Sequence, residues 1–321
     1  MEDQASQLSR RSLVRSREAG ASRKTVLTAL VANAAIALAK LFGGLASGST
    51  AMLAEAAHSL ADTTNQAFLL VSIQLGKREP SPDRPFGHGQ ERFLWTFMAA
   101  VGMFLAGATF AIGYGTYELI KGGEEGGYAI AYAVLGLSFL AEGVSWLRAL
   151  RQTRSEAHEA GLPLLRYARE SRDPNVKMVL FEDSAALVGV ALAAFGVGLH
   201  QLTGSPTFDA SASILIGLLL VSVAVFMGRD AKHLLVGSSA RPEEREIIER
   251  TIEEFGEVDE VLQLLTMALG PNSLLVAARI DLSDGLDSEQ VERVSNEIDG
   301  KLRQTVPDVT EVFLDATARA D

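Results

Sequence analysis

The sequence predicts an α-helical membrane domain with six transmembrane helices, followed by a small α+β domain at the C-terminus. Three observations support this prediction. The mean hydropathy is +0.17 and 48% of the residues are hydrophobic, although 21% are charged. Six apolar segments, each near the roughly 20 residues that a spanning helix needs, lie before residue 236. From Pro242 onward, the hydrophobic residues instead follow the spacing of short amphipathic helices and strands.

The apolar segments define the membrane domain, which we place at residues 23–236. Residues 1–22 are polar and basic. We interpret them as a cytosolic N-terminal tail, because the apolar run that follows is too long for the core of a secretory signal. The six predicted transmembrane helices are, in order, residues 25–46, 50–75, 93–120, 128–147, 176–199 and 210–227.

The connections between these helices predict the orientation. Lysine and arginine gather in the N-terminal tail and after the second, fourth and sixth helices, whereas the other three connections contain one lysine among them. Because basic loops stay on the cytosolic side, we expect all the basic connections and both termini to be cytosolic. The sequence therefore predicts an integral, multi-pass protein of the cell (inner) membrane, with the lipid bilayer around it.

Residues 241–317 are predicted to form a second, cytosolic domain. The expected elements are, in order, a helix over 243–255, strands over 258–268 and 273–282, a helix from Ser288 and a strand over 309–314. The order αββαβ is typical of a small ferredoxin-like domain. A core of about 75 residues is only marginally stable alone, which favours self-association of this domain.

The charge distribution and composition exclude several classes of function. Residues 241–321 contain 20 acidic and 8 basic residues, a balance of −12, which leaves +1 of the total of −11 for the rest. Such an acidic domain is not expected to bind nucleic acid. The absence of cysteine excludes disulfides and thiolate metal sites. Walker motifs and nucleophile elbows are also missing, so we expect neither ATP-driven transport nor enzymatic hydrolysis.

The second predicted helix carries two ionisable residues near its middle. His58 and Asp62 are spaced i, i+4, which puts both on one helix face. Ionisable groups at that depth cost several kcal/mol and usually mark a functional site. An imidazole with a carboxylate provides half of a site for a divalent metal ion.

The fifth predicted helix supplies candidates for the other half. Glu182 and Asp183 are adjacent, so they point about 100° apart, and we expect mainly one of them to face His58. Together with His58 and Asp62 they would give three or four ligands, which suits Zn²⁺, Mn²⁺ or Fe²⁺. The alternative is a buried salt-bridge or hydrogen-bond cluster that joins the helices. We favour the metal site, because we expect no lysine or arginine of the spans to pair with these carboxylates.

Three further polar residues lie inside the predicted helices. Glu142, in the fourth helix, is a candidate for a proton relay or for an outer partner that orients His58, or else for a carboxylate that reaches the cytosolic surface. Asn33, in the first helix, is a candidate for hydrogen bonding between helices or behind the site. Glu55 lies one turn before His58 and is a candidate to line the exit path.

Two stretches resemble the cation diffusion facilitator family. One is the block from Gly48 to Asp62, which reads Gly-Ser-Thr-Ala-Met-Leu-Ala-Glu-Ala-Ala-His-Ser-Leu-Ala-Asp, and the other is Arg84-Pro-Phe-Gly-His-Gly in the next basic loop. Six spans, cytosolic termini and a C-terminal αββαβ domain also match the family. The resemblance implies a homodimeric antiporter that moves Zn²⁺, or sometimes Mn²⁺ or Fe²⁺, out of the cytosol in exchange for protons, without a resident cofactor. A non-transporting membrane metal sensor or scaffold is the competing interpretation.

The resemblance also implies a transport site built from the second and fifth helices, in which His58 and Asp62 match the family pair. The fifth helix differs, because Val179 stands where a His or Asp is usual and Glu182 sits beside Asp183. The sequence Glu-Asp-Ser-Ala-Ala at residues 182–186 resembles the branch that contains human zinc transporter nine. His88 is a candidate for a secondary cytosolic metal site or for a hydrogen bond that positions its loop. No histidine follows His233, so we expect a dimerisation domain without a histidine metal cluster.

Overall fold

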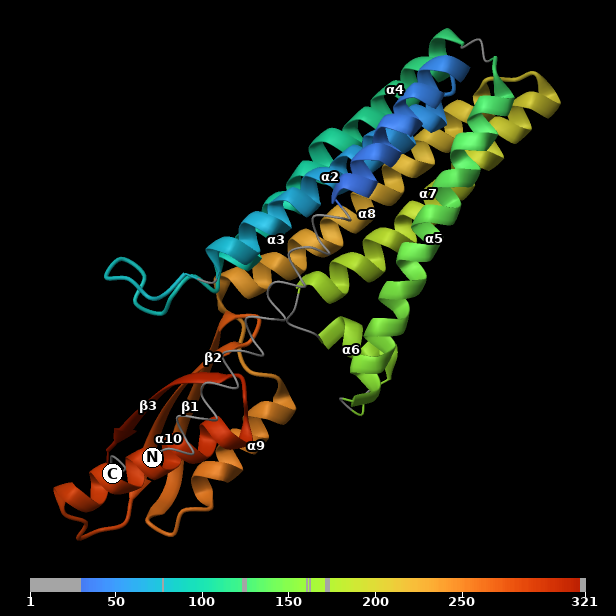
Figure 1. Ribbon diagram of the computed structural model, residues 1–321. Helices are drawn as coiled ribbons and strands as arrows, with labels where there is room; N and C mark the ends of the chain where they lie inside the picture. The colour runs from blue at the N-terminus through green and yellow to red at the C-terminus, as the bar shows by residue number, and fades with distance from the viewer. Residues whose placement is uncertain are drawn as a thin grey trace. The chain divides into compact units, whose positions relative to one another are not determined.

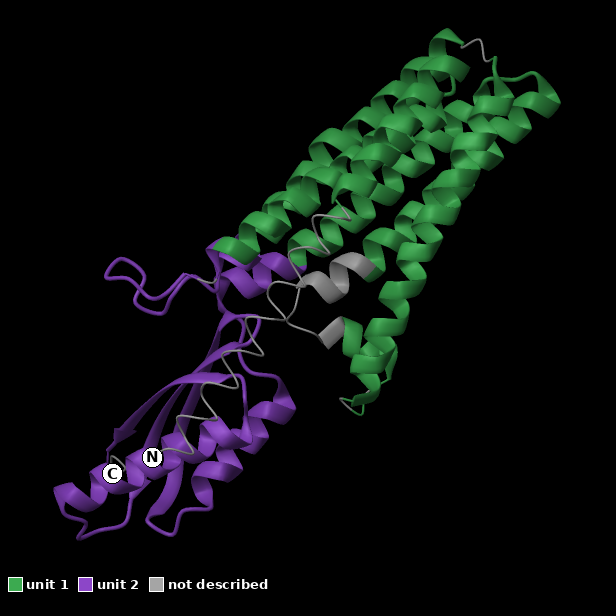
Figure 2. Cartoon of the chain, viewed as in Figure 1, with its two compact units in different colours: residues 1–74, 95–171, 175–229 green, residues 75–94, 172–174, 230–321 purple. Residues whose placement is uncertain are grey.

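The structure, a computed structural model, describes residues 30–76, 78–122, 126–159, 161, 163–170 and 174–317. The predicted N-terminal tail, residues 1–22, lies outside the described residues. The chain divides into two compact units, with residues 1–74, 95–171 and 175–229 in one and residues 75–94, 172–174 and 230–321 in the other (Figure 2). Residues 75–94, which connect the second and third predicted spans, therefore group with the C-terminal part of the chain.

The first unit is a bundle of long helices that lie side by side (Figure 1). Its first helix is described over Leu30–Ser47. The helices that follow are α2 (Thr50–Leu75), α3 (Glu91–Gly102), the π-helical turn η1 (Met103–Ala108), α4 (Thr109–Lys121), α5 (Tyr128–Glu159), the short α6 (Leu164–Glu170), α7 (Pro174–Thr203) and α8 (Thr207–Gly237). Because α3, η1 and α4 follow one another without a break, they form one helix across the bundle.

Five helical segments in the described part of the chain are long and apolar enough to cross a membrane. They are Leu30–Ser47, Glu91–Lys121, Tyr128–Glu159, Leu180–Thr203 and Thr207–Glu253. Helix α2 is not among them, although its 26 residues span about 39 Å, because polar residues lower its hydropathy. Those residues, which include Glu55, His58, Asp62 and Asn65, are buried against the neighbouring helices. Helix α2 thus turns these polar residues toward the inside of the bundle.

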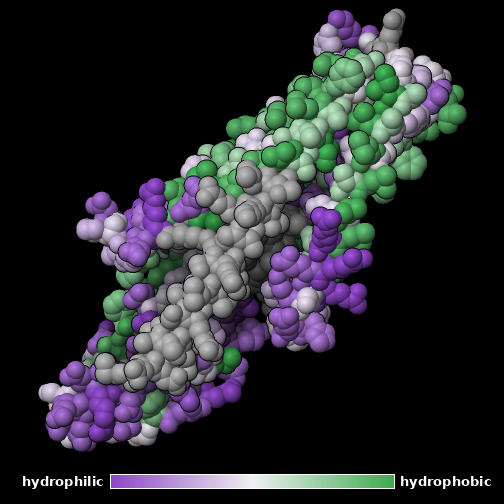
Figure 3. All heavy atoms as spheres, viewed as in Figure 1, coloured by the Kyte–Doolittle hydropathy of each residue, from purple (hydrophilic) through white to green (hydrophobic). Residues whose placement is uncertain are grey.

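Small residues form much of the contact between these helices. The core of the bundle includes Ala54, Ala61, Ala108 and Ala193, all buried. Small side chains let helix backbones approach closely, as is common among membrane helices. Large hydrophobic side chains are exposed instead, for example Phe195 at 71%. Figure 3 shows hydrophobic residues covering much of the helical unit on the face in view, which is the surface that lipid requires.

The second unit contains the expected α+β domain. Its elements are α9 (Pro242–Glu253), β1 (Val258–Gly270), β2 (Ser273–Leu282), α10 (Ser288–Thr305) and β3 (Val309–Ala316). The predicted αββαβ order is confirmed. The sheet has the order β1-β2-β3, with β1 antiparallel and β3 parallel to the central β2. Its core includes Ile248, Ile280, Ile298 and Leu302, all fully buried.

The loop before α3 packs on this sheet domain within the second unit. The rings of Phe86 and Phe313 meet edge to face, with their centroids 6.3 Å apart. Gly89 lies so close to the turn between β1 and β2 that a side chain there would collide with the carbonyl oxygen of Leu269. The half-buried His88 therefore belongs to a loop that is held by contacts on both sides of it.

Candidate functional site

Helix α2 places His58 and Asp62 side by side in the interior of the bundle. His58 Nε2 lies 3.2 Å from Asp62 Oδ2. The two residues are only 1% and 8% exposed. Both His58 ring nitrogens and Asp62 Oδ1 are buried without a hydrogen-bond partner among the described residues. Such atoms are costly to leave unpaired, and they are also the atoms that bind metal ions.

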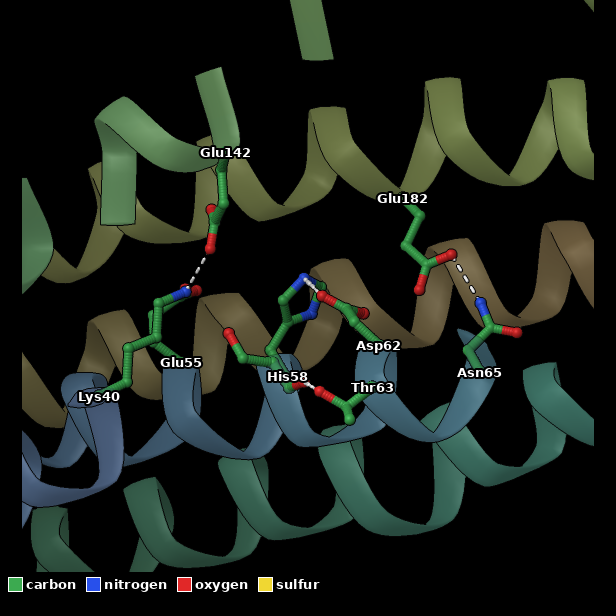
Figure 4. Close-up of polar contacts among 9 residues, drawn as sticks. Lys40, Glu55, His58, Asp62, Thr63, Asn65, Glu142 and Glu182 are labelled. Carbon is green, nitrogen blue, oxygen red and sulfur yellow. Dashed lines mark hydrogen bonds and ion pairs between the residues drawn. The ribbon is translucent and has the colours of Figure 1, made fainter. Parts of the chain in front are cut away.

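Helix α7 adds Glu182 to this pair. The carboxyl groups of Glu182 and Asp62 are within hydrogen-bonding reach of each other, and Glu182 Oε2 accepts a hydrogen bond of 2.6 Å from Asn65 Nδ2 (Figure 4). Asn65 lies one turn after Asp62 on the same helix. We did not assign it a role from the sequence, although its spacing of seven residues from His58 places it on the same face.

Asp183 points to a different helix from Glu182. Its Oδ2 accepts a hydrogen bond of 3.2 Å from Ser145 Oγ on α5. The next residue, Ser184, accepts one of 2.8 Å from Trp146 Nε1 on the same helix. The structure therefore brings three of the four predicted ligands together, namely His58, Asp62 and Glu182, while Asp183 joins α7 to α5. No group of three or more His, Asp or Glu in the described ranges is arranged to hold a metal ion as it stands.

Lys40 is a buried cation within the spans that we had not considered, and the carboxylates that it pairs with are Glu55 and Glu142. Its ammonium group, on the first helix, is fully buried and lies 2.8 Å from Glu55 Oε2 and 2.7 Å from Glu142 Oε1. Glu55 and Glu142 are thus partners of an internal lysine, as Figure 4 shows. Buried ion pairs between helices therefore occur at these two residues, whereas the alternative that we set aside concerned Glu182 and Asp183. The sequence feature that could have predicted these ion pairs is a lysine inside an apolar segment.

Asp209 fixes the point at which α2 begins. This residue, in the first turn of α8, is 1% exposed. Its carboxylate accepts hydrogen bonds from Ser49 Oγ at 2.9 Å and from the backbone amides of Thr50 and Ala51 at 2.5 and 3.1 Å. These amides are among the first N–H groups of a helix, which have no partner within the helix itself. We did not predict this cap from the sequence.

Two further residues with predicted roles are Asn33 and His88. Asn33 is half-buried on the first helix, seven residues or about 10 Å before Lys40. His88 belongs to the second unit. The secondary roles that we expected for these two residues remain predictions.

An apolar helical bundle with ionisable side chains buried in its interior defines a class, that of multi-pass membrane proteins that handle ions. Comparison with known proteins gives the family. Residues 26–236 match the model of the cation efflux transmembrane domain. The chain belongs to the cation efflux, or cation diffusion facilitator, family, which confirms the resemblance seen in the sequence. This is a family of transporters and not of enzymes.

The names of several relatives refer to metals. The mitochondrial proton-coupled zinc antiporter SLC30A9 of Xenopus laevis is 32% identical over 86% of this chain and 50% of its own length. Metal tolerance protein C4 of Arabidopsis thaliana is 32% identical over 82% and 57%. The manganese efflux system protein MneP of Bacillus subtilis is 26% identical over 91% and 95%. The chain therefore spans only about half the length of the first two relatives.

Proposed function

We propose that this protein exports a divalent metal cation from the cytosol in exchange for protons. The observation that carries the proposal is the buried cluster of His58, Asp62 and Glu182, in which His58 and Asp62 have ligand atoms without hydrogen-bond partners among the described residues. The names of the relatives support the same activity. We favour Zn²⁺ as the cargo, with Mn²⁺ or Fe²⁺ as the alternative.

Within the cluster, we infer that Glu182 rather than Asp183 completes the site. Glu182 faces Asp62 and is held by Asn65, whereas Asp183 is engaged with Ser145 on another helix. One imidazole and two carboxylates make a donor set that is richer in oxygen than a site with two histidines. Oxygen donors relax the preference for Zn²⁺, which agrees with relatives named for zinc and for manganese.

Exchange with protons follows from the chemistry of these ligands. A histidine binds metal in its neutral form and a carboxylate in its ionised form, so metal binding releases protons and an excess of protons releases the metal. Histidine changes charge near neutral pH. Rocking of helices about the site, which is general among transporters, would expose it to one side of the membrane at a time.

The orientation and assembly complete the proposal. We place the protein in the cell (inner) membrane with both termini on the cytosolic side, because the basic loops alternate with neutral ones along the chain. We assign transport to residues 23–236 and dimerisation to residues 241–317. The small core of the second domain supports this division of roles.

Transport by the purified protein in liposomes tests the proposal. Zn²⁺, Mn²⁺, Fe²⁺, Co²⁺, Cd²⁺, Ni²⁺ and Mg²⁺ are offered in turn while a dye records the pH inside. We expect saturable metal uptake with opposite proton movement, abolished by Asp62→Ala. Asp183→Asn is the matched control, because it removes a neighbouring carboxylate that lies outside the cluster.

Each part of the proposal has an outcome that contradicts it. Full transport by Asp62→Ala overturns the site. Uptake that is unchanged after all pH gradients are collapsed overturns the exchange with protons. Metal binding without flux favours a membrane metal sensor or scaffold instead.

A further inference from the structure

The buried cluster of Lys40, Glu55 and Glu142 has no part in the proposed metal exchange. Its members come from three helices, the first helix, α2 and α5. The ammonium group lies between the two carboxylates, 2.8 Å from Glu55 Oε2 and 2.7 Å from Glu142 Oε1. The side chains of Lys40 and Glu55 are 0% exposed and that of Glu142 is 13% exposed. Glu55 is three residues before His58, so this cluster lies about one turn along α2 from the proposed metal ligands.

The two carboxylates have more capacity to bind a cation than Lys40 uses. Each gives one oxygen to the ammonium group. The remaining oxygens, Glu55 Oε1 and Glu142 Oε2, are buried without a hydrogen-bond partner in the part of the chain that the structure describes. One ammonium group also compensates only one of two negative charges, and an uncompensated charge in an apolar interior is strongly unfavourable.

Helix α7 leaves room for one of these oxygens. Gly189 faces Glu55 Oε1 so closely that a Cβ atom at this position would collide with it. The free oxygen therefore lies in a space that exists because residue 189 has no side chain. Two carboxylates with spare oxygen atoms around one positive centre form the donor set that hard divalent cations such as Mn²⁺ take in proteins.

We propose that Lys40 is a specificity-determining residue, whose ammonium group fills a second acidic site between Glu55 and Glu142 and so excludes a divalent cation from it. A divalent ion and an ammonium group cannot share this position, because like charges a few Å apart repel strongly in a medium of low dielectric constant. The lysine thus acts as a covalently attached counter-cation. It leaves the interior of the bundle with one position for an exchangeable metal ion, at His58 and Asp62. The role in specificity rests on the proposed transport function. The existence of the second acidic site, between Glu55 and Glu142, does not depend on that function.

The test counts Mn²⁺ bound to the full chain in detergent, by the loss of the free-ion signal in electron paramagnetic resonance. The background variant is His58→Ala/Asp62→Ala, which removes the proposed transport pair. In this background, Lys40→Met should add one bound Mn²⁺ per chain. Lys40→Arg, which keeps the charge, should add none. Glu142→Gln combined with Lys40→Met should remove the added ion.

Thermal unfolding of the variants with and without Mn²⁺ gives a second measurement, which decides the test even if Lys40→Met is unstable. Lys40→Met leaves two buried carboxylates without a cation, so its thermal transition in detergent should rise with Mn²⁺ concentration, because a bound ion stabilises the folded state. The Lys40→Met/Glu142→Gln control should show no such rise. A Lys40→Met chain that aggregates equally with and without Mn²⁺ contradicts the proposal.

Other outcomes separate this proposal from the transport function. The proposed role of Lys40 is overturned if a folded Lys40→Met chain binds no more Mn²⁺ than the His58→Ala/Asp62→Ala background. It is also overturned if the background itself, with Lys40 in place, binds an Mn²⁺ ion that Glu142→Gln removes. A wild-type chain that binds no ion contradicts the proposed transport site. The comparison between the Lys40 variants still decides the second site in that case, since it is made without His58 and Asp62.

Discussion

Ser49 Oγ donates a hydrogen bond of 2.9 Å to Asp209 Oδ1, although the two residues are 160 positions apart in the chain. The same carboxylate also accepts hydrogen bonds from the backbone amides of Thr50 and Ala51. A negative charge at the N-terminus of a helix satisfies its free N–H groups and interacts favourably with the helix dipole. Asp209, in the last long helix of the bundle, thereby fixes the start of α2 and with it the depth of His58 two turns later.

Replacing Asp209 by alanine should destabilise the bundle. The change leaves the Ser49 hydroxyl group and two backbone amides buried without an acceptor, which costs on the order of 1–3 kcal/mol for each lost partner. Denaturant unfolding of the purified protein in detergent measures the loss. Asp284→Ala, at an exposed position of the second unit, is the control and should stay within about 0.5 kcal/mol of the wild type. Equal stability of the two variants would show that the cap does not hold α2.

The two neighbouring carboxylates of α7 should differ in their effect on metal binding. Glu182→Gln removes a charge that faces Asp62, so we expect metal affinity to fall by about tenfold or more. Asp183→Asn keeps a group that can bond to Ser145 and should change the affinity little. Titration calorimetry with Zn²⁺ and Mn²⁺ gives both values. A larger loss for Asp183→Asn than for Glu182→Gln would reverse our assignment.

The contrast between these residues shows what the sequence could predict about the site. Helical spacing fixes which residues of one helix share a face, so the contact of His58 with Asp62 followed from i, i+4 alone. The same spacing separated Glu182 from Asp183 by about 100° but did not say which faced α2. That choice depends on how α7 is rotated against its neighbours, which is set by packing along its whole length.

Lys40 shows why the second cluster was missed. We expected no cation of the spans to pair with the buried carboxylates, yet a lysine in an apolar helix is stabilised when partners reach it from other helices. Those partners, Glu55 and Glu142, lie 15 and 102 residues further along the chain. No local pattern connects them. The αββαβ order of the second domain was simpler to predict, because its helices and strands are amphipathic and each shows its own period.

Gly189→Ala should disturb the Lys40 cluster from the side of α7. An added methyl group would collide with Glu55 Oε1, so either the carboxylate or the helix has to move, and overpacking of this kind typically costs about 1–3 kcal/mol. Denaturant unfolding in detergent measures the change. Gly136→Ala on α5 is the matched control, because its methyl group would meet no atom within 4 Å. A Gly189→Ala chain as stable as Gly136→Ala would mean that Glu55 is not confined by α7.

Gly89→Ala should loosen the loop before α3 from the sheet domain. A Cβ atom at residue 89 would collide with the carbonyl oxygen of Leu269 and lie 3.1 Å from Gly270 Cα. Both are backbone atoms of the β1–β2 region, so no side chain can rotate to relieve the contact. We therefore expect faster hydrogen exchange in residues 86–90 and in the turn after Gly270, since exchange reports local opening. Gly256→Ala, whose methyl group would meet nothing within 4 Å, should leave exchange at both places unchanged. Unaltered exchange in Gly89→Ala would show that the loop does not depend on this contact.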